Sequence, residues 1–110
     1  SSMYLPSRMR MKEARAMHLE TAALMNNASL CLLKDGNVDL ALLAAEKAVA
    51  TEPSLAKGHA RRGEALLAME RYRDASLSFA MALDRQESPE YAALHAELQL
   101  RIEAATREVS

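Results

Sequence analysis

The sequence predicts an all-α protein, a solenoid of helical hairpins with a repeat of 34 residues. Half of the residues are hydrophobic but only 4% are aromatic. The apolar content comes mainly from Ala, Leu and Met, which are strong helix formers. Gly and Pro contribute three residues each, so the connections between helices are expected to be short. A shift of 34 residues superposes small or branched apolar residues that pack helix against helix: Ala22 on Ala56, Leu32 on Leu66, Ala41 on Ala75, Leu43 on Leu77 and Ala48 on Ala82.

Turn signals divide the chain at positions that follow the same spacing. Asp35-Gly36-Asn37 predicts a turn inside the first unit, and Glu70-Arg71 falls at the same place in the second. Glu52-Pro53-Ser54 and Glu87-Ser88-Pro89 close the two units. Apolar residues recur every three to four positions between these signals. The sequence therefore predicts six helices, at about 5–18, 21–34, 37–50, 55–68, 71–84 and 89–108.

These helices group into two full repeats, residues 21–54 and residues 55–88. Ala14 lies 34 positions before Ala48, so residues 5–20 are expected to be the second helix of a truncated repeat whose first helix is absent. The chain is thus expected to begin in the middle of a repeat.

The two ends of the chain differ from the repeats. Residues 89–110 carry an apolar stripe that includes Tyr91, Leu94 and Leu98, with Glu and Arg between. One apolar stripe and one charged face are typical of a capping helix that covers the last core. Residues 1–4 are interpreted as a tag remnant or a disordered segment.

Charge and composition argue against several classes of function. The net charge is −1, so we expect no nucleic-acid partner. No run of 18 apolar residues occurs, so we expect no membrane partner. The single cysteine, Cys31, excludes an intramolecular disulfide and is expected to be buried in a helix. With no visible secretory signal, these features favour a cytoplasmic protein.

The sequence shows no pattern of a metal, cofactor or catalytic site. His18, His59 and His95 lack the spacing of metal ligands. No phosphate-binding loop, nucleophile elbow or pair of catalytic carboxylates is present. We therefore expect no cofactor and no enzymatic activity in this chain.

The two full units resemble tetratricopeptide (TPR) repeats. That family places small residues where its two helices cross, and the matching positions here are Ala28, Ala41, Ala48, Gly63, Ala75 and Ala82. It places large residues toward the next repeat, which Leu66, Tyr72 and Phe79 match, and it ends a repeat with a proline, which Pro53 matches. Three positions depart from the pattern: Ser29 replaces a glycine, Ala45 a bulky residue and Glu87 a proline.

Two segments carry a finer resemblance. The run MNNASLCLLK from Met25 to Lys34 looks like the asparagine-bearing helix of chaperone-binding TPR domains. The run KGHARRGEA from Lys57 to Ala65 looks like the segment that follows it. Together they are most similar to the C-terminal TPR domain of the large immunophilins, which are peptidyl-prolyl isomerases that accompany the ninety-kilodalton heat-shock chaperone.

This resemblance implies a carboxylate clamp for the Glu-Glu-Val-Asp tail of a ninety- or seventy-kilodalton heat-shock chaperone. The family's clamp uses Lys and Asn from one repeat, Asn from the next, and Lys and Arg from the third. Residue by residue, this chain keeps Asn27, Lys57 and Arg61, while the upstream Lys and Asn would lie on the absent helix. His59 and Arg62 are expected to add positive potential or contacts, although His59 also fits a core position.

The spacing of these residues supports the same site without reference to the family. Asn27 and Arg61 are 34 residues apart, so they occupy equivalent places in successive units. Lys57 and Arg61 are four apart and share a helix face. The alternative interpretation is that these are ordinary solvated side chains.

Two other functions remain open. Five of the seven Met residues lie in the first quarter of the chain, at Met3, Met9, Met11, Met17 and Met25. They either pack the repeat core or form a binding surface. In the second case the chain is a scaffold that binds another protein or forms a homodimer through its N-terminal helix. The third possibility is that the chain is the tail of an isomerase whose catalytic domain lies upstream.

Overall fold

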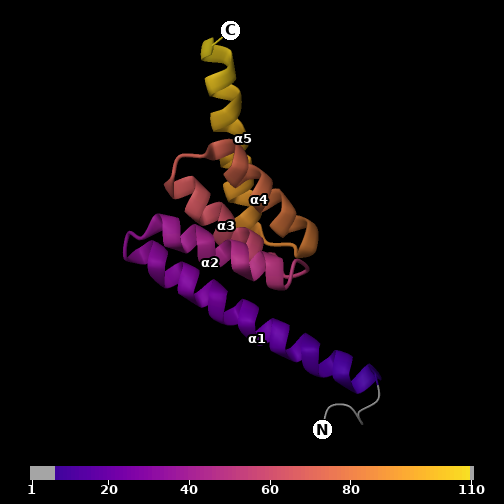
Figure 1. The fold of residues 1–110 in the computed structure, drawn as a ribbon. Coiled ribbons are helices and arrows are strands. Elements are labelled where there is room, and N and C mark those ends of the chain that lie inside the picture. Colours follow the sequence, from indigo (N-terminus) through magenta and orange to yellow (C-terminus); the bar gives the residue numbers. More distant parts are fainter. Residues whose placement is uncertain (1–6, 110) are drawn as a thin grey trace.

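The computed structural model describes residues 7–109 and confirms the all-α fold class. Within this range it contains five helices and no strand: α1 (Ser7–Lys34), α2 (Val38–Thr51), α3 (Ala56–Ala68), α4 (Tyr72–Arg85) and α5 (Pro89–Val109). Helices α1 and α2 form one hairpin, α3 and α4 form the next, and α5 packs on α4 (Figure 1). The hairpins stack through α2 and α3, and also through α1 and α3. The segment 1–4 lies outside the described residues.

The first helix differs from the prediction. Residues 7–34 form one continuous helix of 28 residues, so the predicted break at residues 19 and 20 is wrong. The segment from Met17 to Thr21 contains neither Gly nor Pro, and nothing in it opposes helix propagation. The first half of α1 therefore extends away from the hairpin and does not fold back as a separate helix (Figure 1).

The two turns inside the hairpins have the same geometry. The amide of Asn37 donates to the carbonyl of Leu32 at 2.8 Å, and Gly36 has a φ of +84°. In the second hairpin the amide of Arg71 donates to Leu66 at 2.9 Å, and Glu70 has a φ of +60°. This bond closes the helix end as a Schellman motif, which needs a left-handed residue. Glycine adopts that conformation freely, whereas the glutamate adopts it with strain.

Small residues bring the helices of each hairpin close together, as predicted. Ala41, Ala48, Ala75 and Ala82 are buried completely or almost so, and Ala28 is half-buried. A Cβ atom on Gly63 would lie 2.9 Å from two ring carbons of Phe79. Phe79 is fully buried, and its ring centroid lies 6.3 Å from that of Tyr91.

Position 29 of the first hairpin corresponds to Gly63 of the second. It holds a buried serine, whose hydroxyl donates to the carbonyl of Ala41 at 2.8 Å. The residue that corresponds to Phe79 is Ala45. The two departures from the repeat pattern therefore compensate each other, since a smaller residue opposite leaves room for the serine side chain.

Helix α5 covers the last hairpin, as expected for a cap. Leu98 is buried in the core cluster with Leu66 and Phe79, while Tyr91 and Leu94 pack on the edge of that cluster. The C-terminal half of α5 extends beyond the hairpin (Figure 1). No helix among residues 7–109 is both long and apolar enough to cross a bilayer.

The first half of α1 exposes apolar side chains. Every residue from 7 to 21 is exposed, and Met11 and Met17 retain 71% and 65% of their accessible surface. Cys31, which was expected to be buried, is also exposed. It lies one turn after Asn27, so the two share the face of α1 that points away from buried Ala22 and Ser29.

Candidate peptide-binding site

The residues predicted to form the clamp lie on the first helix of each hairpin. Helices α1 and α3 pack against each other, α1 carrying Asn27 and α3 carrying Lys57 and Arg61. Asn27 and Lys57 are exposed, and Lys57 has no ion-pair partner among residues 7–109. The packing of α1 on α3 thus places an amide and an ammonium on neighbouring helices, both open to solvent.

Arg61 is more enclosed than its neighbours. Its side chain is 16% exposed, and Nη1 donates to the two carboxylate oxygens of Glu64 at 3.0 and 3.3 Å. Its Nε is buried without a hydrogen-bond partner. An unpaired buried donor costs about 1–3 kcal/mol, so this guanidinium retains capacity for an acceptor that reaches it.

Tyr91 of α5 lies beside this pair. Burial raises the pKa of its phenol above the ordinary value of 10.0, the positive charge of Arg61 opposes that rise, and the carboxylates of Glu64 and Glu90 add to it. The site around Arg61 therefore combines one guanidinium, one phenol and two carboxylates. An incoming anion meets a cation that Glu64 has already partly neutralised.

His59 does not contribute to the open surface. Its side chain is 2% exposed, and Nε2 lies 2.9 Å from the carbonyl oxygen of Pro53. A carbonyl only accepts hydrogen bonds, so Nε2 carries the proton. Arg85 of α4 donates to the same oxygen at 2.8 Å. His59 thus fixes the loop between the hairpins, and its predicted contact with a peptide is replaced by a packing role.

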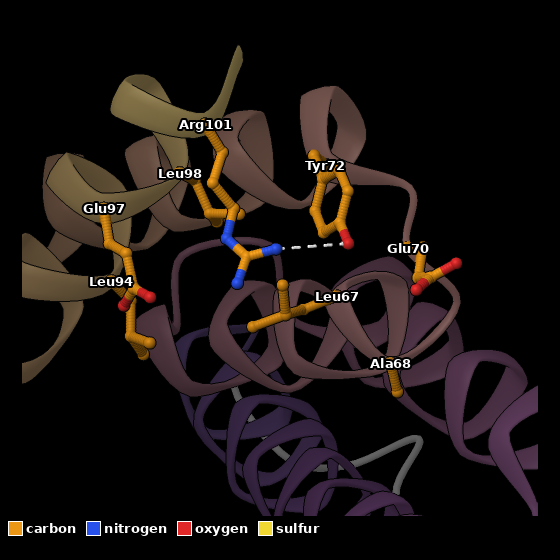
Figure 2. A pocket seen from close by; sticks show the side chains of 8 residues that line it. All are labelled: Leu67, Ala68, Glu70, Tyr72, Leu94, Glu97, Leu98 and Arg101. Atoms are coloured by element: carbon orange, nitrogen blue, oxygen red, sulfur yellow. Dashed lines mark hydrogen bonds between the residues drawn. The ribbon is translucent and has the colours of Figure 1, made fainter. Parts of the chain in front are cut away.

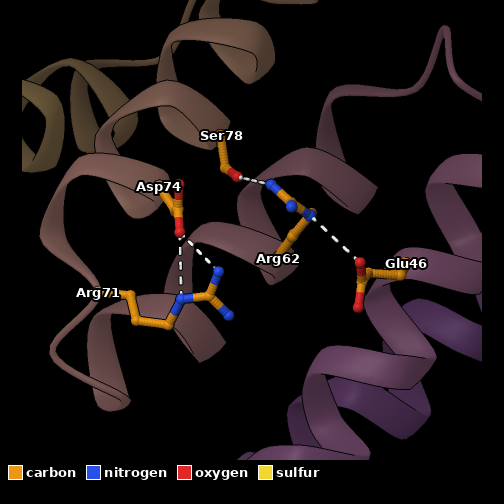
Figure 3. A network of polar contacts seen from close by, with 5 residues as sticks. All are labelled: Glu46, Arg62, Arg71, Asp74 and Ser78. Carbon is orange, nitrogen blue, oxygen red and sulfur yellow. Dashed lines mark hydrogen bonds and ion pairs between the residues drawn. The ribbon is translucent and has the colours of Figure 1, made fainter.

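Arg62 also points elsewhere. Its Nη1 donates to the buried hydroxyl of Ser78 on α4 at 2.7 Å, and its Nε lies 3.8 Å from Glu46 on α2 (Figure 3). Successive residues of a helix point about 100° apart, so Arg61 and Arg62 face different neighbours. Arg62 joins the two hairpins and is already engaged, which leaves Asn27 and Lys57 exposed and Arg61 partly exposed beside Glu64.

The structure adds polar residues that the sequence did not single out. Asn26, next to Asn27, is 2% exposed, and its Oδ1 is buried with no hydrogen-bond partner. Arg15 forms an ion pair with the buried Glu52 and also donates to Ser54. Arg15 and Glu52 are 37 residues apart, and no local spacing rule signals such a pair.

Ser54 and Arg15 act on the same carboxylate. The hydroxyl of Ser54 donates to Glu52. This hydrogen bond, followed by the one from Arg15, holds the pKa of Glu52 below its ordinary value. The ion pair is the link between the N-terminal half of α1 and the loop that separates the hairpins.

The three histidines lie on α1, α3 and α5. Within residues 7–109, no group of three His, Cys, Asp or Glu side chains is arranged to hold a metal ion. Neither protein-family models nor curated proteins give a match to this chain.

Proposed function

We propose that this chain is a TPR-type module that binds the acidic C-terminal tail of a cytosolic heat-shock chaperone. The contacts would come from Asn27, Lys57 and Arg61. The observation that carries the proposal is a set of donors on two adjoining helices: an exposed amide, an ammonium without an ion-pair partner within the described residues, and a guanidinium that is paired with Glu64 but keeps an unpaired Nε.

The chemistry of a terminal Glu-Glu-Val-Asp peptide suits these donors. Its last residue carries two carboxylates, and charge-assisted hydrogen bonds contribute about 1.5–3 kcal/mol each before costs. Lys57 and Arg61 lie one turn apart on α3, so one aspartate spans both. The amide of Asn27 offers both a donor and an acceptor to the peptide backbone.

Glu64 opposes peptide binding at Arg61. A peptide carboxylate that reaches Arg61 competes with the bonds at 3.0 and 3.3 Å to Glu64. We therefore expect the clamp to bind the peptide weakly, and we expect most of the favourable electrostatic free energy to come from Lys57. We also propose that this protein is cytoplasmic, like the chaperone whose tail it binds. The intact protein would carry a catalytic isomerase domain elsewhere.

The test is calorimetric titration of this chain with a peptide that ends in Glu-Glu-Val-Asp, against the same peptide with an amidated C-terminus. We expect the acid to bind at least about tenfold tighter than the amide, which corresponds to about 1.4 kcal/mol. Binding should weaken at high salt. Lys57→Ala and Arg61→Ala should each reduce the affinity, whereas Lys47→Ala, on the exposed face of α2, should leave it unchanged. Equal affinity for acid and amide would contradict the proposal.

A second candidate function is self-association through the N-terminal half of α1. The observation in its favour is the exposed apolar surface of Met9, Met11 and Met17, outside both hairpins. Sedimentation velocity over a wide concentration range tests it. A sedimentation coefficient that does not change with concentration would argue against this function.

A further inference from the structure

Two surfaces at opposite ends of the molecule have opposite charge. The first is the basic arm, residues 7–21 of α1, all of which are exposed. It contains four cationic side chains, of Arg8, Arg10, Lys12 and Arg15, against two carboxylates, of Glu13 and Glu20. Arg8 and Lys12 are four residues apart, so they share one face, and neither has an ion-pair partner among residues 7–109.

The second surface is the acidic cap, residues 89–109 of α5. It contains four carboxylates, of Glu90, Glu97, Glu103 and Glu108, against two guanidinium groups, of Arg101 and Arg107. Glu90, Glu97 and Glu108 are separated by seven and eleven residues, which places them on one face of the helix. All three are exposed, and none forms an ion pair within the described part of the chain.

A hollow of about 410 Å³ lies beside this acidic stripe, between the end of α3 and α5. Leu67 of α3 and Leu94 of α5 line it, and Glu97 and Arg101 stand over it (Figure 2). Arg101 donates to the hydroxyl of Tyr72 at 3.3 Å, which keeps its guanidinium over the tyrosine ring. The carboxylate of Glu97 has no such partner within residues 7–109.

The hollow has the volume of a ligand pocket, whose usual range is about 300–1,000 Å³. Its leucines accept an apolar side chain, and its edge carries the free carboxylate of Glu97. The flexible thioether chain of methionine fits irregular apolar spaces of this kind. On the basic arm, Met9 lies next to Arg8 and three residues before Lys12. One short segment therefore supplies both an apolar side chain for the hollow and cations for the acidic stripe.

We infer that the basic arm of one copy docks on the acidic cap of a second copy, with a methionine in the hollow and Arg8 and Lys12 against Glu97 and Glu108. This inference rests on the second candidate function and names the surface that the arm binds. The contact is head-to-tail, because the two surfaces are different parts of the chain. Each copy added in this way leaves one free arm and one free cap, so chains can grow beyond a dimer.

The contact is expected to be weak. The arm, residues 7–21, spans about 22 Å, or roughly four helical turns. Such a contact lies at the low end of specific interfaces, so we expect a dissociation constant on the order of 10–100 µM at low salt. Between two oppositely charged exposed surfaces, the affinity should fall by about tenfold or more at high salt.

Two charge-reversed variants test the inference by sedimentation velocity, with circular dichroism to check that each is folded. The arm variant carries Arg8→Glu and Lys12→Glu, and the cap variant carries Glu97→Lys and Glu108→Lys. We expect each variant alone to associate at least about tenfold more weakly than the original chain. A control with Lys34→Glu and Lys47→Glu has the same net charge as the arm variant, and it should associate like the original.

Mixing distinguishes the possible pairings. The arm variant keeps an intact cap and the cap variant keeps an intact arm, and the reversed arm of the first also complements the reversed cap of the second. A head-to-tail contact therefore predicts that the mixture associates although neither variant does so alone, and that its chains alternate between the two variants. A chain with all four substitutions should regain association, because both surfaces are reversed together.

Two results would overturn the inference. If the arms pair with each other, the cap variant alone will associate like the original chain. This result would leave the second candidate function in place. A chain that stays monomeric at millimolar concentration and low salt would reject the inference and that function together.

Discussion

Replacing Gly63 with alanine should destabilise the protein, although alanine is the better helix former. In an open helix this change would add about 0.5–1 kcal/mol of stability. Here the new Cβ would lie 2.9 Å from two ring carbons of Phe79. The ring is fully buried and packs against Tyr91, so it cannot retreat without disturbing the core.

The magnitude follows from these opposing contributions. Overpacking a well-packed core costs about 1–3 kcal/mol, and the gain in helix propensity offsets up to about 1 kcal/mol of it. We expect a net loss of roughly 0.5–2 kcal/mol in the free energy of unfolding. For a domain of this size, about 1 kcal/mol corresponds to about 4–8 °C in Tm.

Urea denaturation followed by far-ultraviolet circular dichroism measures this loss. A double-mutant cycle with Phe79→Leu isolates the clash, because leucine lacks the two ring carbons in question. In the background of Phe79→Leu, the change Gly63→Ala should be neutral or stabilising. A Gly63→Ala protein at least as stable as the original would refute the reasoning, since the close contact would then have no energetic consequence.

Four further substitutions have expected effects on stability. Glu70→Gly should stabilise the protein by about 1 kcal/mol by removing left-handed strain, and Gly36→Ala should destabilise it similarly; thermal unfolding measures both, and no gain at Glu70 would contradict the turn geometry. The pKa of Glu52 is lowered in the folded state, so its contribution to stability is present above the ordinary value of 4.5 and is lost as the pH falls through the lower folded value; Ser54→Ala should weaken this pH dependence in an acid titration of Tm. Asn26→Leu should raise the stability by about 1–2 kcal/mol by removing a buried acceptor without a partner, and an unfolding curve that shows a loss would mean that the amide has a partner.

The sequence predicted the features that repeat. The 34-residue register correctly located both hairpin turns, the loops between units and the small residues at the helix crossings. It even paired Gly36 with Glu70, although only the structure shows that a glutamate adopts the left-handed conformation there. Repetition is informative because each unit must bury the same face against its neighbour.

The sequence was less informative where the repeat ends. The same register predicted a break near residue 20, but periodicity alone does not interrupt a segment of good helix formers, and α1 continues through it. His59 and Arg62 were expected to add positive potential or contacts to the site, with a core position left open for His59. In the structure His59 bonds to the carbonyl of Pro53 and Arg62 bonds to Ser78, which lie 6 and 16 positions away. Cys31 was expected in the core because of its residue type, and only the placement of α1 shows which of its faces is covered.

Because α1 is continuous, its N-terminal half projects from the hairpin as a helical rod. The 28 residues of α1 amount to a rod of about 42 Å, and beyond the hairpin the ion pair of Arg15 with Glu52 is its anchor. Isolated helices shorter than about 12–15 residues are marginal in water, so the turns before Arg15 should open far more often than those after Asn26. Amide hydrogen exchange should therefore be faster in the turns before Arg15 than in those after Asn26, and the rate should change most sharply near Arg15. A partner that binds the part of α1 before Arg15 would slow exchange there and make the exchange rates along α1 more uniform. Through the ion pair of Arg15 with Glu52, such binding would also act on the loop between the hairpins.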